Sequence, residues 1–348
     1  MRVACVSIFT PGHGATPARE RTRRMARGLV DRGHEVVWLC ARWWGGDHGT
    51  FEEDGIEYRS VVTDPAPTTF AAKLPGALRR VAPDVIHAVN SPPTCGLGAT
   101  VAGTLLRTPV LVDWWRDHPD DDSRRYGPLA RSADLLTAPS RTTKTRVREH
   151  GAAGDAVRVL PESIDMDLVR GADVDDRFDA VYSRRLDRHA NVETFLLALA
   201  ELRGRDWRAA VIGDGPERER IESTAGDLRI DDRVRFLGER PLEERISIFK
   251  GTHVVAGTAT WETFPTELLW ALACGCVGLV EYQADSSAHE LVEGRKRGRL
   301  VTSPAELADE FVAVADLERR TVDESFASYD HGTVVDRQID AYRDLIEN

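Results

Sequence analysis

A loop around Glu262 contains the residues of this sequence that are best suited to chemistry. Residues 257–275 have the pattern of a buried strand end, a loop with Glu262, and a short apolar helix that begins near Pro265 and ends at Gly275. The free N–H groups and the dipole at a helix start attract phosphate, and a carboxylate accepts hydrogen bonds from hydroxyl groups. This combination predicts a site for a sugar phosphate.

Two further loops contain groups suited to a diphosphate. An apolar segment at 180–183 is followed by three arginines, which are Arg184, Arg185 and Arg188. Arginine binds phosphate groups through paired N–H donors. The next apolar segment is followed by a tight turn, Gly213-Asp214-Gly215-Pro216. Ordinary surface charge and ordinary turn chemistry are the alternative interpretations of these two loops.

The N-terminal half contains a glycine-rich loop and a histidine loop. Gly12-His13-Gly14 follows the first predicted strand, where its backbone can approach a phosphate closely. A dinucleotide enzyme also needs an acidic residue at the end of the second strand, where this chain has Ala41-Arg42. An NAD site is therefore disfavoured, and an NADP site through Arg42 is little better. His118, beside Asp117, can donate a hydrogen bond to a sugar hydroxyl, with a plain surface loop as the alternative.

A predicted helix at 18–32 is rich in arginine. Its arginines are Arg19, Arg21, Arg23, Arg24, Arg27 and Arg32. A solvated face with interspersed acidic residues is one interpretation, and a cationic patch for an anionic acceptor or an anionic membrane is the other. Both interpretations stay open at this point. The formal net charge of the whole chain is −11, which argues against a nucleic-acid binder.

Length and composition favour a cytoplasmic protein of two domains. A chain of 348 residues is long for one core. No apolar run approaches the roughly 18 residues that a membrane span requires, and the first residues resemble a strand rather than a signal peptide. The five cysteines are expected to be buried thiols, because no further Cys or His pair at metal-ligand spacing accompanies them.

Apolar segments alternate with helical patterns along both halves of the chain, which is typical of parallel sheets covered by helices on both faces. The predicted strands are residues 3–9, 35–39, 84–88, 110–114, 135–138 and 157–161, then 180–183, 207–212, 234–236, 253–256, 277–280 and 299–301. A polar stretch at 171–177 is the predicted interdomain linker. Ligands of such sheets bind beyond the carboxyl ends of the strands, where the loops described above lie.

Several short motifs follow one another in a definite order. In the C-terminal half they are Arg184-Arg185-Leu186, Val211-Ile212-Gly213-Asp214-Gly215-Pro216, Arg233-Val234-Arg235-Phe236-Leu237-Gly238, Glu262-Thr263-Phe264-Pro265, Ala271-Leu272-Ala273-Cys274-Gly275 and His289-Glu290-Leu291-Val292. Upstream, Gly33-His34-Glu35-Val36 and Pro83-Asp84-Val85-Ile86-His87 belong to the same series. Their order and spacing resemble the GT-B glycosyltransferases, specifically glycosyltransferase family 4. The resemblance covers nearly the whole chain.

This resemblance implies an α/β fold of GT-B architecture, with two Rossmann-like domains facing across a cleft. Residues 1–162, with a C-terminal helix at about 330–348 packing back on them, would bind the acceptor. Residues 163–329 would bind a nucleotide-sugar donor. The implied activity is a retaining, hexosyltransferase-like transfer to a glycan, lipid-linked or other acceptor. No cofactor or metal would be required, and the location would be cytoplasmic or peripheral at the inner membrane face.

The same resemblance implies roles for individual residues. Arg185 would bind the diphosphate, Glu262 would orient the transferred sugar, and the loop at Arg240 would lie near the base. Arg185, Glu262 and His118 are the expected catalytic residues. The other expected donor-binding residues are Gly14, Arg188, Gly213, Asp214, Phe264, Pro265, Thr266 and Glu267.

The sequence departs from the family pattern at three positions. The family has a second glutamate eight positions after the first, where this chain has Trp270, and a lysine where this chain has Ala190. It also frequently has an asparagine where this chain has Glu162. Glu267 is the candidate replacement for the missing carboxylate, with helix capping as the alternative. Two other functions therefore stay open. One is a non-catalytic GT-B protein that binds a nucleotide sugar or a partner, and the other is a nucleotide-sugar epimerase of the same architecture.

Overall fold

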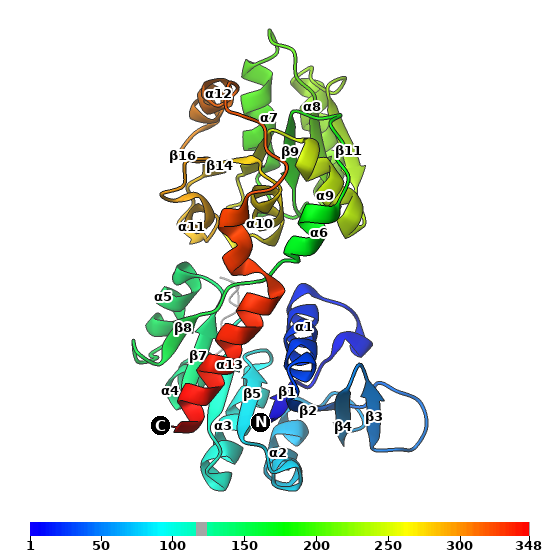
Figure 1. Ribbon diagram of the computed structural model, residues 1–348, viewed down its shortest axis with the longest axis vertical. Coiled ribbons are helices and arrows are strands. Elements are labelled where there is room, and N and C mark those ends of the chain that lie inside the picture. The colour runs from blue at the N-terminus through cyan, green and yellow to red at the C-terminus, as the bar shows by residue number, and fades with distance from the viewer. Residues whose placement is uncertain (116–123, 348) are drawn as a thin grey trace. The chain divides into compact units, whose positions relative to one another are not determined.

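The computed structural model of the protein describes residues 1–115 and 124–347 (Figure 1). Its contacts divide the chain into two compact units. Unit 1 is Met1–Glu162 together with the chain from His331 onward, and unit 2 is Ser163–Asp330. Each unit has a mainly parallel sheet covered by helices, so the predicted α/β class is confirmed.

Unit 1 is built on an eight-stranded sheet in the order β3-β4-β2-β1-β5-β6-β7-β8. The strands are β1 (Arg2–Val6), β2 (Glu35–Ala41), β3 (Thr50–Glu53), β4 (Ile56–Val62), β5 (Val85–Val89), β6 (Val110–Asp113), β7 (Leu135–Ala138) and β8 (Val157–Val159). Only the β3–β4 pair is antiparallel among the described pairs. The sequence prediction lacks this hairpin, although its turn, Asp54-Gly55, has positive φ at both residues and is a favoured hairpin sequence.

Two sets of helices cover this sheet. One face packs against α1 (Pro17–Asp31) and α13 (His331–Glu347), and the other against α2 (Pro67–Val81), α3 (Pro93–Leu106), α4 (Tyr126–Ser132) and α5 (Arg141–Glu149). A short 3₁₀ turn, η1 (Pro11–His13), precedes α1. Helix α13 belongs to unit 1 although it follows unit 2 in the sequence, as the red helix beside α1 shows in Figure 1. Its Tyr342 hydroxyl lies 2.5 Å from Nδ1 of the buried His87.

Arg21 of α1 is buried and does not lie on a solvated or membrane-facing surface. Its side chain is 1% exposed, with Nε 3.3 Å from Asp113 Oδ2 and Nη1 3.5 Å from Glu162 Oε1. It also donates to the carbonyl oxygens of Leu160 and Pro161. Three of the other arginines on α1 pair with carboxylates, as Arg23–Glu20, Arg24–Glu162 and Arg27–Asp54, and Arg32 at its carboxyl end pairs with Asp336. Most of these arginine charges are therefore paired, which favours the interpretation as a solvated face, and a cationic patch for an acceptor or a membrane stays a prediction.

Unit 2 is built on a six-stranded parallel sheet in the order β11-β10-β9-β12-β14-β16. The strands are β9 (Ala180–Ser183), β10 (Ala209–Ile212), β11 (Val234–Gly238), β12 (Val254–Gly257), β14 (Val277–Glu281) and β16 (Gly298–Val301). Each overlaps a predicted strand, so the predicted strand series of this half is confirmed. A separate two-stranded ribbon joins β13 (Trp261–Glu262) to β15 (Asp285–Ser286).

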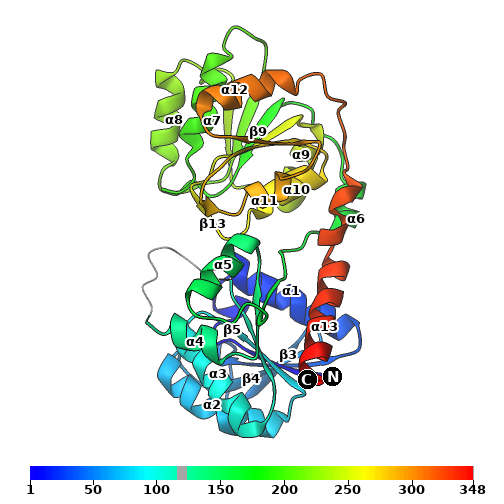
Figure 2. The ribbon, with the colours of Figure 1, turned by 90° about the vertical axis from the view of Figure 1, so that its left-hand side faces the viewer.

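Helices lie on both faces of this second sheet (Figure 2). The helices α7 (Val192–Glu201), α8 (Arg218–Asp227) and α12 (Pro304–Ala313) cover one face, and α9 (Leu242–Gly251), α10 (Thr266–Ala273) and α11 (His289–Val292) cover the other. Unit 2 also contains α6 (Met166–Gly171) and a 3₁₀ segment, η2 (Glu324–Tyr329), which leads toward α13.

The prediction of an interdomain linker at 171–177 is wrong, because this stretch packs against α9 within unit 2. The Asp175 N–H donates to the Ser247 carbonyl at 2.9 Å. A Cβ at Gly251 would lie 2.0 Å from the Asp175 carbonyl oxygen, so the two backbones are in close contact. The boundary between the units instead falls between Glu162 and Ser163.

The five cysteines are Cys5, Cys40, Cys95, Cys274 and Cys276, and all are buried, as predicted. Burial raises the pKa of the Cys5 and Cys274 thiols to about 12. Within the described part of the chain, no helix combines the length and the apolar character that crossing a membrane would require.

Candidate functional site

The candidate site lies at the carboxyl ends of β9 and β12 in unit 2. From β9 the chain proceeds to β10 on one side of the sheet and later returns to β12 on the other side. Connections therefore diverge between β9 and β12, and open α/β sheets bind their ligands at such a switch point. A small pocket at this position is lined by residues that include Ser183, Arg184, Thr258, Glu262 and Leu268.

The loop that carries Glu262 is held from two directions. On one side, the pairing of β13 with β15 is extended by a hydrogen bond from the Ser287 N–H to the Glu262 carbonyl at 3.1 Å. On the other side, Arg184 Nη1 donates to the Trp261 carbonyl at 3.0 Å. The Thr260 N–H also donates to the His189 carbonyl at 2.9 Å. The backbone of the loop is thus held in place on both sides of Glu262.

The environment of Glu262 disfavours its charged form. Burial raises the pKa of the Glu262 carboxyl above its ordinary value, and the negative charges of Glu267 and Asp187 act in the same direction. The cation of Arg184 opposes this shift without cancelling it. A carboxyl group with this environment at a switch point is a candidate functional group, because cationic or hydrogen-bonding ligands would stabilise its charged form.

Glu267 lies beside Glu262 and is engaged with two other elements. Its Oε2 accepts a hydrogen bond from Ser183 Oγ at 2.9 Å, and its Oε1 forms an ion pair with Arg245 of α9. The side chain makes no capping hydrogen bond to α10, so the capping interpretation is wrong. The contacts instead connect the end of β9 to α9 and α10.

The start of α10 differs by one residue from the expectation. The helix begins at Thr266, and Pro265 precedes it as the capping residue. Phe264 is 8% exposed, and its ring centroid lies 6.5 Å from that of Tyr329. Phe264 is therefore part of the packing that supports the loop, and a donor contact of Phe264, Pro265 or Thr266 stays a prediction.

The exposed cations around the switch point differ in their partners. Arg185 is exposed, and its guanidinium has no ion pair or hydrogen bond with any residue that the structure describes. Arg188 Nε lies 3.0 Å from His189 Nε2. Arg240 Nε lies 3.3 Å from Glu244 Oε1 on α9. Of these three side chains, Arg185 is the most available to an anionic ligand.

The glycines of the turn after β10 are required by close packing between two loops. Gly213 has φ of +125°, and a Cβ there would lie 2.0 Å from the Arg184 carbonyl oxygen. A Cβ at Gly215 would lie 2.2 Å from the Leu186 carbonyl oxygen. The Leu186 N–H also donates to the Asp214 carbonyl at 2.9 Å. The turn thereby positions the two arginines at 184 and 185, and direct donor contacts of Gly213 and Asp214 stay predictions.

The remaining predicted residues lie outside this constellation. Gly14 belongs to unit 1, where its N–H donates to the Pro11 carbonyl and its own carbonyl accepts from Arg19 Nη1 at 2.7 Å. His118 lies outside the described residues. Within unit 2, the structure brings Glu262 and Glu267 together at the switch point and places Arg185 on the adjacent loop.

Sequence reasoning missed three residues that shape the site, which are Ser183, Arg245 and Asn191. It named Arg184 only as a candidate for binding a diphosphate and did not predict its contact with the Glu262 loop. Asn191 has positive φ, and its Nδ2 donates to the Thr258 carbonyl at 2.9 Å and to Glu281 Oε2 at 2.8 Å. Asn tolerates positive φ better than most residues, which is the only local signal for it. Arg245 has no such signal, because its partner lies on another helix.

The described residues of the site were also compared with the requirements of a metal ion. Among the described residues, no three His, Cys, Asp or Glu side chains are grouped so that they could hold a metal ion. The expectation that the reaction needs neither metal nor cofactor stays a prediction.

Comparison with known proteins places the chain in a family. The sequence model described as glycosyl transferases group 1 matches residues 169–343, which is half of the chain. The chain belongs to this family. A second model, described as a glycosyl transferase 4-like domain, matches residues 18–162. The two matched regions fall largely in unit 2 and unit 1, respectively.

Curated relatives of this group 1 family member match over part of its length. A D-inositol 3-phosphate glycosyltransferase of Corynebacterium jeikeium (strain K411) is 29% identical over 220 residues, which are 56% of this chain and 52% of the relative. A lipopolysaccharide 1,6-galactosyltransferase of Escherichia coli (strain K12) is 23% identical over 193 residues, which are 54% and 53% of the two chains. The chain thus spans about half the length of the curated relatives it matches.

Solved structures match the family member over its whole length. Anabaena Alr3699/HepE in complex with UDP superposes with a TM-score of 0.77 at 20% identity and covers 99% of both chains. The apo form of the lipopolysaccharide outer core galactosyltransferase WaaB gives a TM-score of 0.73 at 15% identity and covers 99% of both chains. At these identities the likeness shows the fold. The predicted GT-B architecture of two Rossmann-like domains is confirmed.

Proposed function

We propose that this chain is a retaining glycosyltransferase of family 4 that transfers a sugar from a nucleoside-diphosphate sugar to a glycan, lipid-linked or other acceptor. The observation that supports this proposal most strongly is the half-buried Glu262 with its raised pKa at the switch point of unit 2, and the exposed Arg185 on the adjacent loop. A carboxyl group for the sugar and a cation for the diphosphate are the two parts that this reaction requires. The family membership of the chain supports the same reaction class.

Unit 2 is the proposed donor domain. Arg185 would neutralise the diphosphate as it departs, and Arg188 would assist it. The amino end of α10 would contribute its dipole to the same negative charge. Because the Alr3699/HepE structure contains UDP, uridine nucleotides are the first donors to test. Unit 1 is the proposed acceptor domain.

Glu262 is proposed to orient the hydroxyl groups of the transferred sugar. In the resting protein its charged form is disfavoured by burial. A developing positive charge on the sugar ring would stabilise the carboxylate, so the interaction would be stronger in the transition state than in the ground state. Arg184 would act as a positioning residue, because it fixes the loop before Glu262 through the Trp261 carbonyl.

A cytoplasmic location completes the proposal. It is based on the expected supply of nucleotide sugars. The paired arginines of α1 give no support for membrane contact through that face.

The test is turnover with a panel of nucleotide sugars and acceptors, followed by proton NMR of the anomeric centre of the product. Retention of configuration is the expected result. Inversion, or no turnover with any donor in the panel, would contradict the proposal. Conversion of the donor with no acceptor present would favour an epimerase, and donor binding without any turnover would favour a non-catalytic binding protein.

A further inference from the structure

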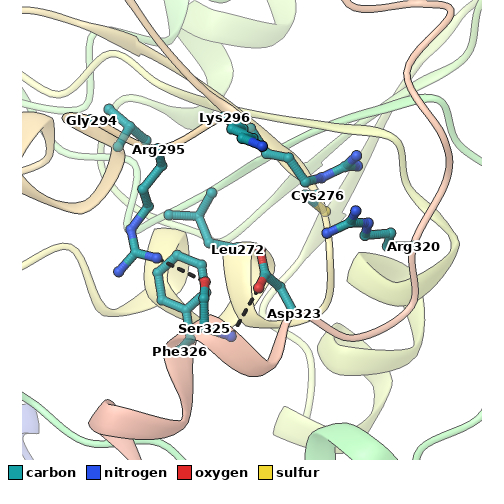
Figure 3. A pocket seen from close by; sticks show the side chains of 11 residues that line it. Leu272, Cys276, Gly294, Arg295, Lys296, Arg320, Asp323, Ser325 and Phe326 are labelled. Carbon is teal, nitrogen blue, oxygen red and sulfur yellow. Dashed lines mark hydrogen bonds between the residues drawn. The ribbon is translucent and has the colours of Figure 1, made fainter.

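Unit 2 contains a second pocket at the opposite end of its sheet from the donor site. The pocket has a volume of about 330 Å³ and is lined by Leu272, Val292, the loop of residues 294–297, and residues of the segment 320–326 (Figure 3). The loop 294–297 precedes β16, and Cys276 precedes β14, so the pocket lies at the amino ends of these strands. A ligand here would not overlap the switch point at the carboxyl ends. We call it the basic pocket.

Four cationic side chains line the basic pocket. They are Arg295, Lys296, Arg297 and Arg320. Asp323 is the one acidic side chain among the described lining residues. This gives four positive charges against one negative charge in a chain whose net charge is −11. Local positive charge against a negative background marks the pocket as a place where an anion would be attracted.

The cations of the basic pocket are incompletely paired. Arg297 donates to the carbonyl oxygens of Gly275 at 2.7 Å and Glu318 at 2.8 Å, and its buried Nε has no hydrogen-bond partner among the described residues. Burial, together with the nearby charge of Arg320, lowers the pKa of Arg297. Arg320 Nη2 lies 3.9 Å from Glu318 Oε2, at the outer limit of an ion pair. The positive charges of Arg297 and Arg320 repel each other, and a bound anion would relieve that repulsion.

Lys296 and Arg295 complete the wall of the pocket. The Lys296 ammonium has no ion pair with any residue in the described part of the chain. Arg295 Nη1 donates to Ser325 Oγ at 2.8 Å, and its guanidinium lies 3.9 Å from the centroid of the Phe326 ring. Figure 3 shows Arg295 on one side of Leu272 and Arg320 on the other, so positive groups line the pocket from two segments of the chain.

We propose that the basic pocket binds a small phosphorylated anion. A phosphoryl group offers three oxygens and close to two negative charges, which suits several arginine and lysine donors converging from different directions. A monocarboxylate offers two oxygens and one charge, and so satisfies fewer of these donors. The apolar floor of Leu272, Val292 and Phe326 can contact the organic part of such a ligand.

Occupancy of the basic pocket would join two segments of unit 2. The loop 294–297 and the segment 320–326 would bind the same anion, and the second segment leads through η2 into α13. The ligand would therefore order the chain just before it returns to unit 1. This inference concerns binding alone and does not depend on the activity proposed above.

The experiment measures the binding of inorganic phosphate to the full chain by calorimetry, and maps it by hydrogen–deuterium exchange. Phosphate should protect residues 293–298 and 320–326 from exchange. The double variant K296Q/R320Q should weaken phosphate binding by about tenfold or more, since each lost phosphate contact removes a charge-assisted hydrogen bond. The variant R185A should bind phosphate in this pocket as the wild type does, which separates the pocket from the proposed donor site.

The matched control is K73Q/R235Q, which removes the same charge from two exposed side chains elsewhere and should leave phosphate binding unchanged. Unchanged thermal midpoints without phosphate would show that both double variants fold. Flotation with phosphatidylcholine vesicles, with and without phosphatidic acid, distinguishes a lipid headgroup from a free phosphate as the source of the ligand. If neither phosphate nor the acidic vesicles bind, or if K296Q/R320Q binds as well as the wild type, the proposal is overturned.

Discussion

The guanidinium of Arg184, at the end of β9, donates to the carbonyl of Trp261, the residue before Glu262, with 3.0 Å between the two atoms. The Arg184 side chain is only 12% exposed, so little water competes for this hydrogen bond. One contact thereby joins the carboxyl end of the first strand of unit 2 to the loop of the proposed sugar-binding carboxylate.

Replacing Arg184 with methionine should impair catalysis more than folding. The change leaves the Trp261 carbonyl without its donor, which typically costs about 1–3 kcal/mol of folding free energy. Because the Glu262 loop would then be free to shift, kcat/KM should fall by about tenfold to a hundredfold. Urea unfolding and steady-state kinetics measure the two effects. The exposed R235M variant is the control, and an R184M enzyme with unchanged kcat/KM would show that Arg184 has no positioning role.

Replacing Glu262 with glutamine should stabilise the protein at neutral pH and reduce its activity. The folded-state pKa of Glu262 is raised chiefly by burial, so its contribution to stability is present at low pH and is lost as the pH rises through that pKa. Glutamine does not titrate. The free energy of unfolding of E262Q minus that of the wild type should therefore increase as the pH rises from about 4, the ordinary range of a glutamate pKa.

Urea unfolding of E262Q and the wild type at acidic and neutral pH checks this expectation, and the turnover assay checks the loss of activity. A stability difference that is constant across pH would argue against a raised pKa of Glu262 in the folded protein. A difference that falls with rising pH would mean that folding lowers the pKa of Glu262 instead of raising it.

A pair of variants at Glu267 and Arg245 separates donor binding from structural support. Both E267Q and R245M break the same ion pair, and each should cost about 1–3 kcal/mol of stability. Only E267Q removes the carboxylate that is the candidate replacement for the second glutamate of the family pattern. If Glu267 contacts the donor, E267Q should raise the donor KM by about tenfold, while R245M changes it much less. Equal effects of the two variants on KM would assign Glu267 a supporting role only.

The fold was predictable from the sequence where the apolar pattern was strong, and less so where polar residues are buried. The six strands of the main sheet of unit 2 contain many β-branched and small apolar residues, and each of these strands was predicted. The segment at 171–177 is polar, but its backbone packs on α9 through the contact of Asp175 with Gly251. That contact is possible because Gly251 has no side chain. The sequence of residues 171–177 alone does not indicate that they pack against this glycine.

Arg21 shows that the burial of a charged side chain is equally hard to predict from the sequence. Its partner Asp113 is 92 residues away in the sequence, and its surroundings on α1 are polar, so the helix alone predicted an exposed side chain. In the proposed donor site, the loop of Glu262 was predicted from its local pattern. The contact of Arg184 with this loop was not predicted, because only the tertiary structure decides which of two neighbouring arginines turns inward.

Removal of the buried cation at Arg21 should destabilise unit 1 strongly. The variant R21M would leave the carboxylates of Asp113 and Glu162 without the cation that pairs with both, and breaking such a buried pair typically costs about 3–5 kcal/mol. The control is R24M, which removes a half-exposed partner of Glu162 and should cost about 1 kcal/mol or less. Urea unfolding of both variants checks this difference. Similar losses in the two variants would mean that the buried cluster contributes little to stability.

The most direct test of the account is the binding of nucleoside diphosphates to the wild type and to R185A by calorimetry. The account predicts that at least one of UDP, GDP, ADP and TDP binds the wild type, and that R185A weakens this binding by about tenfold or more, because it removes the exposed cation beside the switch point. The variant R235A, which removes an exposed arginine from β11, should bind as the wild type does. If no nucleoside diphosphate binds, or if R185A binds as tightly as the wild type, the proposed donor site is contradicted.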